Sequence, residues 1–304
     1  MTQSSLRPAL AALLFLSACE SAAIAPSDAG TDAVVGDAGP PRAITIGPEA
    51  RPATVVMPAA YDGTTQLPVV FLLHGYSVNA AVQDTYFGAS RVARSMGFYL
   101  VLPEGTEDAS GKQFWNATPG CCDFGRTGVD DVAYLTGLLD ELEERVPVDT
   151  TRVYFTGHSN GGFMSYRMAC ELAPRIAGIA VLAGSDFAGE MDCVPSMPVS
   201  VLHVHGTDDA SVPYENGGSY PGARDTVLRW AGRASCDTTM VETLEPIDLV
   251  STLEGAETRR ERWATGCATG TSAELWTIVD GNHQPPFDRD AYADMIGWLF
   301  TRHR

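Results

Sequence analysis

The chain has 304 residues, of which 45% are hydrophobic, and its formal net charge is −18. This hydrophobic content is enough for a packed core, so the composition excludes a wholly disordered chain. The length allows one large domain or two small ones. The strongly acidic balance argues against nucleic acid or a bare anionic membrane as a partner, because both are polyanions.

The first residues have the pattern of an export signal. Arg7 supplies a positive charge, and the apolar run at 9–16 is too short to span a bilayer as a helix. The run ends in Leu-Ser-Ala-Cys, which resembles a bacterial lipobox. This resemblance implies removal of residues 1–18 and lipidation of Cys19. Because Glu20 rather than an aspartate follows, it also implies an outer-membrane or cell-surface location. A plain secretory signal with an incidental cysteine is the alternative.

Residues 19–41 have a composition that does not support folding. They are rich in Ala, Asp, Gly and Pro and almost lack large apolar side chains, so they cannot bury enough surface to form a core. We expect an extended tether here, followed by a single domain over residues 42–304.

Within that domain, strand-like and helix-like runs alternate. Two early runs predict antiparallel edge strands, and a continuous apolar run at 69–73 predicts a strand covered on both faces. Strands that alternate with helices predict a mostly parallel, doubly wound sheet in an α/β fold. In chain order we expect strands 43–46, 53–57 and 69–73, helix 84–96, strand 98–102, an irregular segment 105–128, helix 130–146, strand 152–156, helix 163–170, strands 176–182 and 199–204, helix 225–233, a polar strand 258–264, strand 273–279 and helix 289–300.

The run Gly-His-Ser-Asn-Gly at 157–161 contains the candidate nucleophile. It lies between the strand expected at 152–156 and the helix expected at 163–170. A strand, G-x-S-x-G and a helix form the nucleophile elbow, a tight turn that exposes a serine hydroxyl at the end of a parallel sheet. Glycines are needed beside the serine because larger residues would collide with the neighbouring strand and helix. The context therefore predicts Ser159 as the nucleophile, with an ordinary glycine-rich turn as the alternative.

The general base follows from chain order, since in this fold the serine precedes the acid and the acid precedes the histidine. His283 and His303 are the histidines that follow the expected acid loop. His303 is the penultimate residue, where fraying prevents a fixed geometry. We therefore expect His283 to be the base, with a surface loop histidine as the alternative. His74 ends a strand before the nucleophile, so we expect it to be structural.

The acid should lie in the loop after the strand at 199–204. That loop contains two adjacent carboxylates, Asp208 and Asp209. The acid must be buried and must bond to His283, because it fixes the imidazole tautomer and stabilises the imidazolium. Neighbouring loop residues can both point inward, so the residues themselves leave this choice open.

An oxyanion hole requires two backbone N–H groups that point at the developing negative oxygen. We expect one from Asn160, which follows the nucleophile at a helix N-terminus. We expect the other from Tyr76, because Gly75 before it permits a close backbone approach.

Several motifs together resemble the polyhydroxybutyrate depolymerase/feruloyl esterase group of α/β-hydrolases. The resemblance implies the α/β-hydrolase fold and places the acid at Asp209, the fifth residue of the His-Gly-Thr-Asp-Asp run, ahead of Asp208 and Asp280. The sequence departs from the group after His283, where the usual tryptophan is absent, and this change affects one wall of the cleft. The matching runs are His-Gly-Tyr at 74–76, Trp-Asn-Ala at 115–117, Val-Asp-Asp-Val at 129–132, Gly-His-Ser-Asn-Gly-Gly at 157–162 and His-Gly-Thr-Asp-Asp at 205–209.

The resemblance implies a carboxylic ester hydrolase that works by two-step acyl transfer, with no metal or cofactor. The expected substrates are feruloyl-type esters on plant polysaccharide. Acetylxylan and polyhydroxyalkanoate are alternatives, and a serine peptidase or a non-catalytic surface-binding lipoprotein are more distant ones. Trp115 and Tyr214 are candidates for the substrate pocket.

The cysteine count agrees with export. Apart from Cys19 there are six cysteines, and an even number in an exported chain suggests three disulfides. Cys121 and Cys122 are adjacent, and we expect each to bond elsewhere because a disulfide between neighbours is strained. The expected pairs are Cys236–Cys267, and Cys121 and Cys122 with Cys170 and Cys193 in either order.

Overall fold

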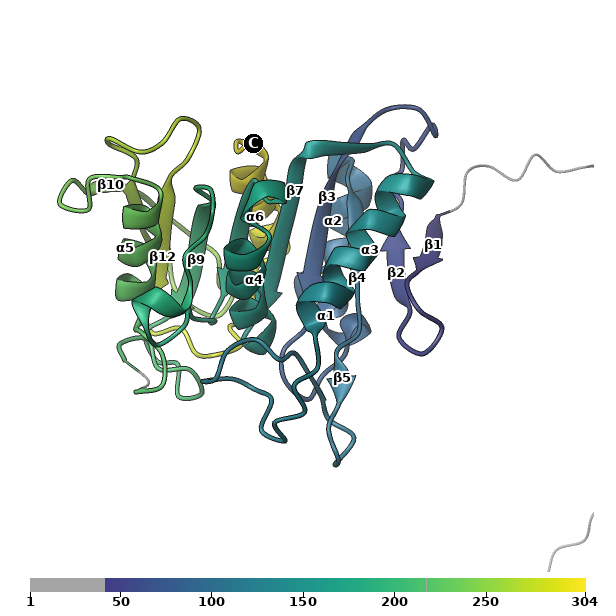
Figure 1. The fold of residues 1–304 in the computed structure, drawn as a ribbon. Coiled ribbons are helices and arrows are strands. Elements are labelled where there is room, and N and C mark those ends of the chain that lie inside the picture. The colour runs from purple at the N-terminus through teal and green to yellow at the C-terminus, as the bar shows by residue number, and fades with distance from the viewer. Residues whose placement is uncertain (1–41, 217) are drawn as a thin grey trace, which may run out of the picture. The chain divides into compact units, whose positions relative to one another are not determined.

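The computed structural model describes residues 42–216 and 218–304. The predicted signal at 1–18, the lipidation site Cys19 and the tether at 19–41 lie outside these residues. Ten strands form one sheet in the order β1-β2-β4-β3-β7-β8-β9-β12-β11-β10 (Figure 1). The strands from β4 to β12 in this order pair in parallel, and those at both edges pair antiparallel. The predicted doubly wound α/β sheet is confirmed.

The elements have the following bounds. The strands of the large sheet are β1 (Ala43–Ile46), β2 (Ala53–Val56), β3 (Leu67–Leu73), β4 (Tyr99–Leu102), β7 (Val148–His158), β8 (Gly178–Leu182), β9 (Ser200–Gly206), β10 (Glu242–Ile247), β11 (Thr258–Trp263) and β12 (Ala273–Ile278), and a separate small pair is β5 (Thr106–Glu107) and β6 (Gln113–Phe114). The helices are α1 (Ala80–Phe87), α2 (Ala89–Met96), α3 (Asp131–Arg145), α4 (Asn160–Glu171), α5 (Ala223–Arg233) and α6 (Ala291–Phe300), with short 3₁₀ turns η1 (Ala173–Arg175) and η2 (Glu190–Asp192).

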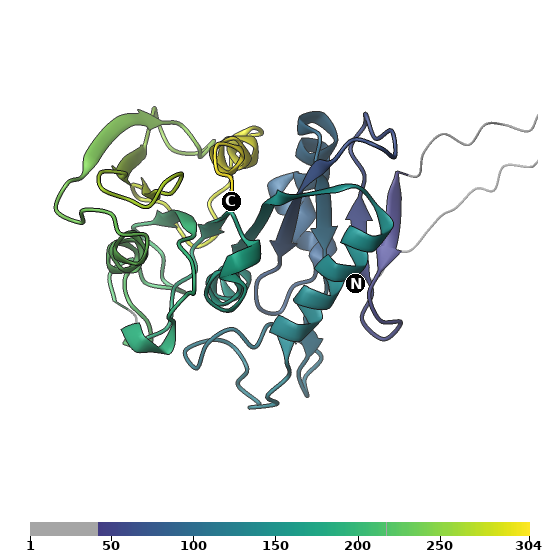
Figure 2. The ribbon, with the colours of Figure 1, turned by 45° about the horizontal axis from the view of Figure 1, so that its top comes forward.

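Helices cover both faces of the sheet (Figure 2). Alternate residues of a strand point to opposite faces, so Phe71 of β3 packs in the core beneath α3 and α4, and the next residue, Leu72, packs in the core beneath α1, α2 and α6. Burial on both faces explains why the central strands read as continuous apolar runs.

Several elements differ from the sequence expectation, among them the small pair β5 and β6, which lies inside the segment expected to be irregular. The helix predicted at 84–96 is divided into α1 and α2 by Gly88, whose φ of 61° ends the first helix in a left-handed turn. Strand β10 was not predicted, because it is a mostly exposed edge strand whose residues lack an apolar run. Its partner β11 was expected from its polar β-pattern.

Three disulfides lie among the described residues, and one of them is an expected pair. Cys236 bonds to Cys267, as expected. The expected bonds from Cys121 and Cys122 to Cys170 and Cys193 are wrong. Cys170 and Cys193 are joined with a Cα–Cα distance of 5.7 Å, an ordinary span for a disulfide, and Cys121 is joined to Cys122.

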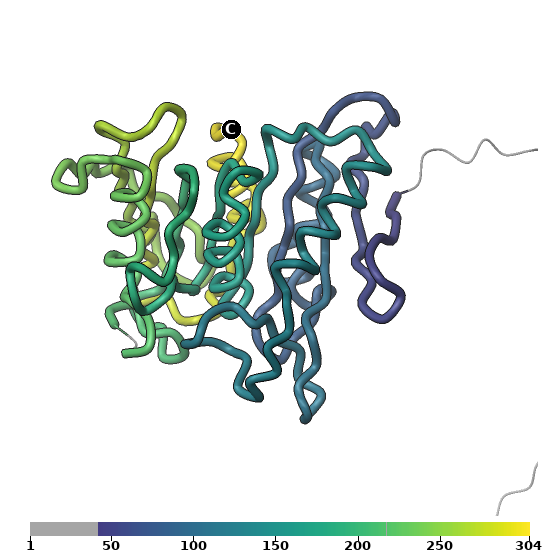
Figure 3. The backbone as a smooth tube through the Cα atoms, in the orientation of Figure 1, coloured from purple at the N-terminus to yellow at the C-terminus, as the bar shows by residue number. Residues whose placement is uncertain are grey.

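The carboxyl ends of the parallel strands meet along one edge of the sheet, and the candidate functional loops gather there. The segments that follow β3, β6, β7, β9 and β12 lie together at the lower edge in Figure 3. In open α/β sheets this edge is where ligands bind. Over the part of the chain that the structure describes, no helix is long and apolar enough to cross a membrane.

Candidate active site

The turn between β7 and α4 has the geometry of a nucleophile elbow. Ser159 has φ 54° and ψ −121°, a positive-φ conformation that a serine adopts only under constraint from its surroundings. A Cβ on Gly157 would overlap the carbonyl of Gly161, and a Cβ on Gly161 would overlap the carbonyl of Leu73. The two glycines therefore permit the approach of strand, turn and helix that holds Ser159 at the sheet edge, where it is partly exposed.

The loops after β9 and β12 bring His283 to Asp209. His283 Nδ1 donates to Asp209 Oδ2 over 2.7 Å, and Asp209 Oδ1 accepts the N–H groups of Ser211 and Val212, each over 2.8 Å. Burial raises the pKa of Asp209, but the hydrogen bonds from His205 and His283 outweigh it and hold this pKa below its ordinary value. The carboxylate is therefore ionised at neutral pH.

The structure separates the three candidate acids. Asp209 is 5% exposed and bonds to His283, whereas Asp208 and Asp280 are exposed. The residues left the choice between Asp208 and Asp209 open, and the family resemblance favoured Asp209. That preference agrees with the observed hydrogen bond to His283.

His158 fastens the His283 loop to the elbow. Its Nε2 lies 2.8 Å from the carbonyl oxygen of His283, and the two rings are 4.7 Å apart between centroids. Burial is the main cause that lowers the pKa of His158 to about 3, and the neighbouring His283 lowers it further. His158 is therefore neutral and donates this bond. Sequence reasoning did not identify this role. Its position next to Ser159 is the signal that could have suggested it.

The loop after β3 lies against the nucleophile. A Cβ built on Gly75 would be 3.6 Å from Ser159 Cβ, so the backbone that leads to Tyr76 passes directly beside the serine. Asn160 is the first residue of α4, so its N–H belongs to the helix N-terminus. The two expected oxyanion donors therefore flank Ser159. The Tyr76 hydroxyl donates to Asp108 Oδ2 over 3.0 Å.

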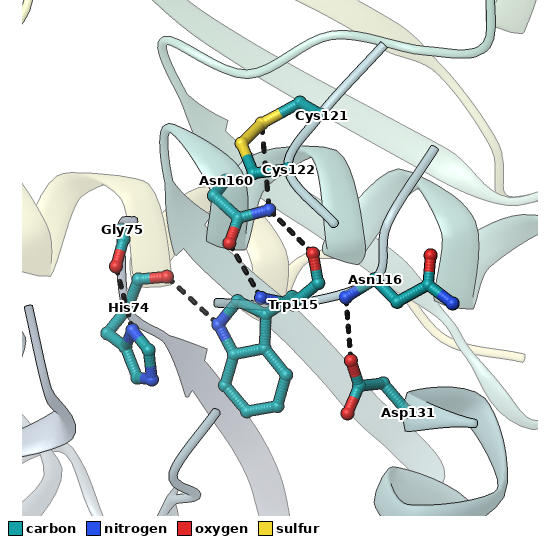
Figure 4. The surroundings of a disulfide bond; sticks show 8 residues. All are labelled: His74, Gly75, Trp115, Asn116, Cys121, Cys122, Asp131 and Asn160. Carbon is teal, nitrogen blue, oxygen red and sulfur yellow. Dashed lines mark hydrogen bonds between the residues drawn. A yellow bond between two sulfur atoms is a disulfide. The ribbon is translucent and has the colours of Figure 1, made fainter. Parts of the chain in front are cut away.

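The side chain of Asn160 anchors the segment at 105–128 to the elbow (Figure 4). Its Oδ1 accepts the Trp115 N–H over 2.7 Å, and its Nδ2 donates to the Trp115 carbonyl over 3.0 Å and contacts Cys121 Sγ at 3.6 Å. The Trp115 indole N–H donates to the carbonyl of His74 over 2.9 Å. Asp131 at the start of α3 accepts the N–H of Asn116 over 2.7 Å.

These contacts correct one expectation about the pocket. Trp115 has no exposed surface, so its predicted place in the substrate pocket is wrong: the indole packs against the His74 ring and the Arg51 guanidinium. Tyr214 is half-buried, its hydroxyl is 2.8 Å from Thr277 Oγ1, and its ring packs edge-on against His205. Its place in the pocket stays a prediction.

Three cavities lie among the described residues, and none of the three is lined by Ser159, Asp209 or His283. One of about 620 Å³ lies beside the anchored segment, and another of about 470 Å³ lies over α1. The hydroxyl of Tyr86, which lines the second, donates to the carbonyl of Pro285 in the His283 loop over 2.9 Å. A larger cavity of about 790 Å³ lies over η2 and α5. The lining of the first includes Asn116, Thr118, Arg126, Arg167 and Phe187.

Buried neutral histidines predict that the fold loses stability in mild acid. Burial lowers the pKa of His74 to about 4, that of His158 to about 3, and that of His203 well below its ordinary value. Between these values and about pH 6.5 the unfolded chain binds protons that the native chain does not, so stability falls as the pH falls. Each histidine contributes up to about 1.4 kcal/mol per pH unit.

Urea unfolding at about pH 7.5, 6 and 5 measures this effect. The exposed His303 provides a control, because His303→Gln should reproduce the wild-type curve. A free energy of unfolding that stays constant from pH 7.5 to 5 would contradict the expectation.

No family model matches the chain, but comparison with known proteins finds relatives. The chain is 29% identical over 265 residues to feruloyl esterase B of Piromyces equi, and the match covers 83% of this chain and 45% of that protein. It is 26% identical over 271 residues to feruloyl esterase D of Neurospora crassa, covering 84% of this chain and 82% of that protein. The chain spans 45%, 60% and 20% of the first three curated relatives that it matches, less than two thirds of each.

Solved structures share the fold. An acetyl xylan esterase from Aspergillus awamori superposes with a TM-score of 0.58 at 14% identity, over 84% of this chain and 99% of that one. At this identity the likeness establishes the fold alone. The chain therefore has the α/β-hydrolase fold, and proteins named feruloyl esterases are among its relatives in sequence.

Proposed function

We propose that the chain is a carboxylic ester hydrolase in which Ser159 is the nucleophile, His283 the general base and Asp209 the acid. The observation that carries this proposal is the 2.7 Å hydrogen bond between His283 and the buried Asp209, at the edge of the sheet where the strained turn presents Ser159. The relatives that are named esterases also support it.

The mechanism follows from the roles of these groups. His283 takes the proton of the Ser159 hydroxyl, and the oxygen attacks the ester carbonyl. The N–H groups of Asn160 and Tyr76 stabilise the oxyanion. His283 then protonates the departing alcohol and activates the water that hydrolyses the acyl-enzyme. Asp209 stays ionised throughout and stabilises the imidazolium, in agreement with its lowered pKa.

The proposed substrates are feruloyl-type esters linked to plant polysaccharide. The names of two relatives favour this class, and the name of a structural neighbour motivates acetylated xylan as the second candidate. Purified protein should be assayed with methyl ferulate, acetylated xylan, hydroxybutyrate oligomers and a peptide amide. Turnover of methyl ferulate well above the other three supports the proposal. Preference for another ester would assign a different substrate class to the enzyme. Turnover of the amide alone would contradict the proposed esterase activity.

Replacing Asp209 and Asp208 one at a time distinguishes the proposed acid from its neighbour. Asp209→Asn should lower kcat by roughly three to four orders of magnitude, because the amide favours the wrong imidazole tautomer and carries no charge to stabilise the imidazolium. Asp208→Asn is the matched control, since Asp208 is exposed, and it should stay within about twofold of wild type. Hydrolysis of p-nitrophenyl acetate measures both. Equal losses in the two variants would contradict the assignment of the acid.

We further propose that the protein is exported and lipid-anchored at Cys19. The three disulfides among the described residues support export, because such bonds persist in oxidising compartments. Mass spectrometry of the mature N-terminus provides the test. A diacylated Cys19 supports the anchor, and an unmodified N-terminus contradicts it.

A further inference from the structure

A row of buried polar side chains runs from α4 through β9 to the acid. The Tyr166 hydroxyl lies 2.9 Å from His203 Nδ1, and His203 Nε2 lies 3.0 Å from His205 Nδ1. His205 Nε2 lies 3.1 Å from Asp209 Oδ2. Tyr166, His203 and His205 are at most 1% exposed. None of them has a role in the mechanism derived above.

The hydrogen bonds in this row have a single direction. His205 Nε2 faces the Asp209 carboxylate and the carbonyl of Val212 at 2.8 Å, so it must carry the proton. With the single ring proton of His205 on Nε2, its Nδ1 atom is an acceptor, and the donor to it is His203 Nε2–H. His203 Nδ1 in turn accepts from the Tyr166 hydroxyl. Burial favours the neutral ring, since it lowers the pKa of His203.

The row ends on the oxygen that also binds His283. Asp209 Oδ2 accepts from His205 and from His283, while Oδ1 accepts two backbone N–H groups. A carboxylate with four donors has little freedom to rotate. The donor from His205 also withdraws charge from the oxygen that His283 faces.

We propose that Tyr166, His203 and His205 are positioning residues of the esterase. Together they fix the orientation of Asp209 and limit the charge that Oδ2 presents to His283. Asp209 and the carbonyl of Val212 fix the tautomer of His205, and that tautomer fixes the one of His203. The Tyr166 hydroxyl on α4 completes the row by donating to His203 Nδ1, and so stabilises the donor at the acid. This inference rests on the proposed function and adds to it the groups that tune its acid.

A purely structural role would have a different signature. If the row only satisfied buried polar groups, its loss would lower stability and the amount of active enzyme but would leave the pH profile of the remaining enzyme unchanged. A positioning role changes the pH profile. The other titratable groups facing His283 and Asp209 are His158 and Tyr220, Tyr214 packs against His205, and Asp186 and Arg233 face the far end of the row. All of these stay in place in the variants below.

The first comparison uses His205→Leu and His205→Gln. Leucine has no N–H, whereas the glutamine amide can place one where Nε2 now lies. His205→Leu should lower kcat by about tenfold or more with little change in KM, since a hydrogen bond to a charged group is lost. The greater charge left on Oδ2 then stabilises the His283 imidazolium more strongly than in wild type. The acid limb of the pH profile of kcat/KM, where activity falls as His283 becomes protonated, should therefore move to higher pH. His205→Gln should restore most of kcat and the wild-type limb.

The second comparison uses two buried tyrosines. Tyr166→Phe removes the start of the row and should move the acid limb in the same direction by a smaller amount. Tyr292→Phe is the matched control, because its hydroxyl is also buried and bonded to a side chain, Thr156 Oγ1 at 2.9 Å, but lies outside the row. If His205→Leu does not fold, this pair decides the question. A shift in Tyr166→Phe alone supports the proposal, and identical limbs overturn it.

Failure of the inference can be told apart from failure of the proposed function. The downfield proton resonance of His283 Nδ1–H reports its bond to Asp209 without any turnover. We expect it to shift in His205→Leu and to stay in place in Tyr292→Phe. Wild-type protein without esterase activity would remove the proposed function. Active variants in which the resonance and the acid limbs do not shift would refute only the positioning role of the row.

Discussion

Ser159→Ala is expected to lower kcat on p-nitrophenyl acetate by about five to six orders of magnitude. The substitution removes the nucleophilic hydroxyl that the elbow presents at the sheet edge, and with it the acyl-enzyme. The remaining rate over water then comes from the oxyanion donors and from substrate binding. The variant should fold normally, because the Ser159 side chain caps no helix N–H.

Ser165→Ala is the matched control for this prediction. Ser165 lies in the second turn of the same helix, is buried, and donates to the carbonyl of Gly161 over 2.8 Å. We expect wild-type kcat from it. A fluorophosphonate probe should label wild type and Ser165→Ala on the peptide that contains Ser159 and should leave Ser159→Ala unlabelled. If wild type and Ser159→Ala hydrolyse the ester equally slowly, the chain is a non-catalytic protein on a hydrolase fold.

The largest expected effect on stability comes from Gly161→Ala. An added Cβ would overlap the carbonyl groups of Leu73 and His74, which belong to the backbone of β3 and the residue after it. Backbone of a central strand cannot move aside without breaking its pairing with β7. We expect a loss of about 4 kcal/mol or more in the free energy of unfolding, or no soluble protein.

Gly137→Ala provides the opposite expectation with the same chemical change. Gly137 lies inside α3, and a Cβ there would meet no atom within 4 Å. Alanine should therefore stabilise the protein by about 0.5–1 kcal/mol through its helix propensity. Urea unfolding compares the two variants. Similar unfolding free energies for both would show that the elbow tolerates a side chain, contrary to the contacts described above.

The sequence predicted the elements whose signals are local. The elbow could be located because its glycines, its preceding strand and its following helix are contiguous. His283 could be selected because chain order left one alternative at a fraying end. Asp209 could be chosen over Asp208 only by family resemblance, because which neighbour points inward depends on contacts with Ser211 and Val212 that residue types do not encode.

The failures have a common physical origin. Trp115 was assigned to the pocket because an aromatic residue in a long loop can line a cleft or pack beneath it, and only the partner of its indole N–H distinguishes the two. The pairing of Cys121 depended likewise on where Cys170 and Cys193 lie in space. The row behind Asp209 joins α4 to β9, so its members could not be grouped from their positions along the chain.

The anchoring of the 105–128 segment has a consequence for how the surface near the nucleophile can vary. Asn160 is attached to the nucleophile by a peptide bond and to Trp115 by two hydrogen bonds, so the base of this segment is rigidly coupled to the reactive serine. Thr118 and Arg126 belong to the same segment but take no part in the anchor, and they line the cavity of about 620 Å³. Mutation and insertion in this outer part can therefore reshape the cavity while the chemistry is inherited unchanged.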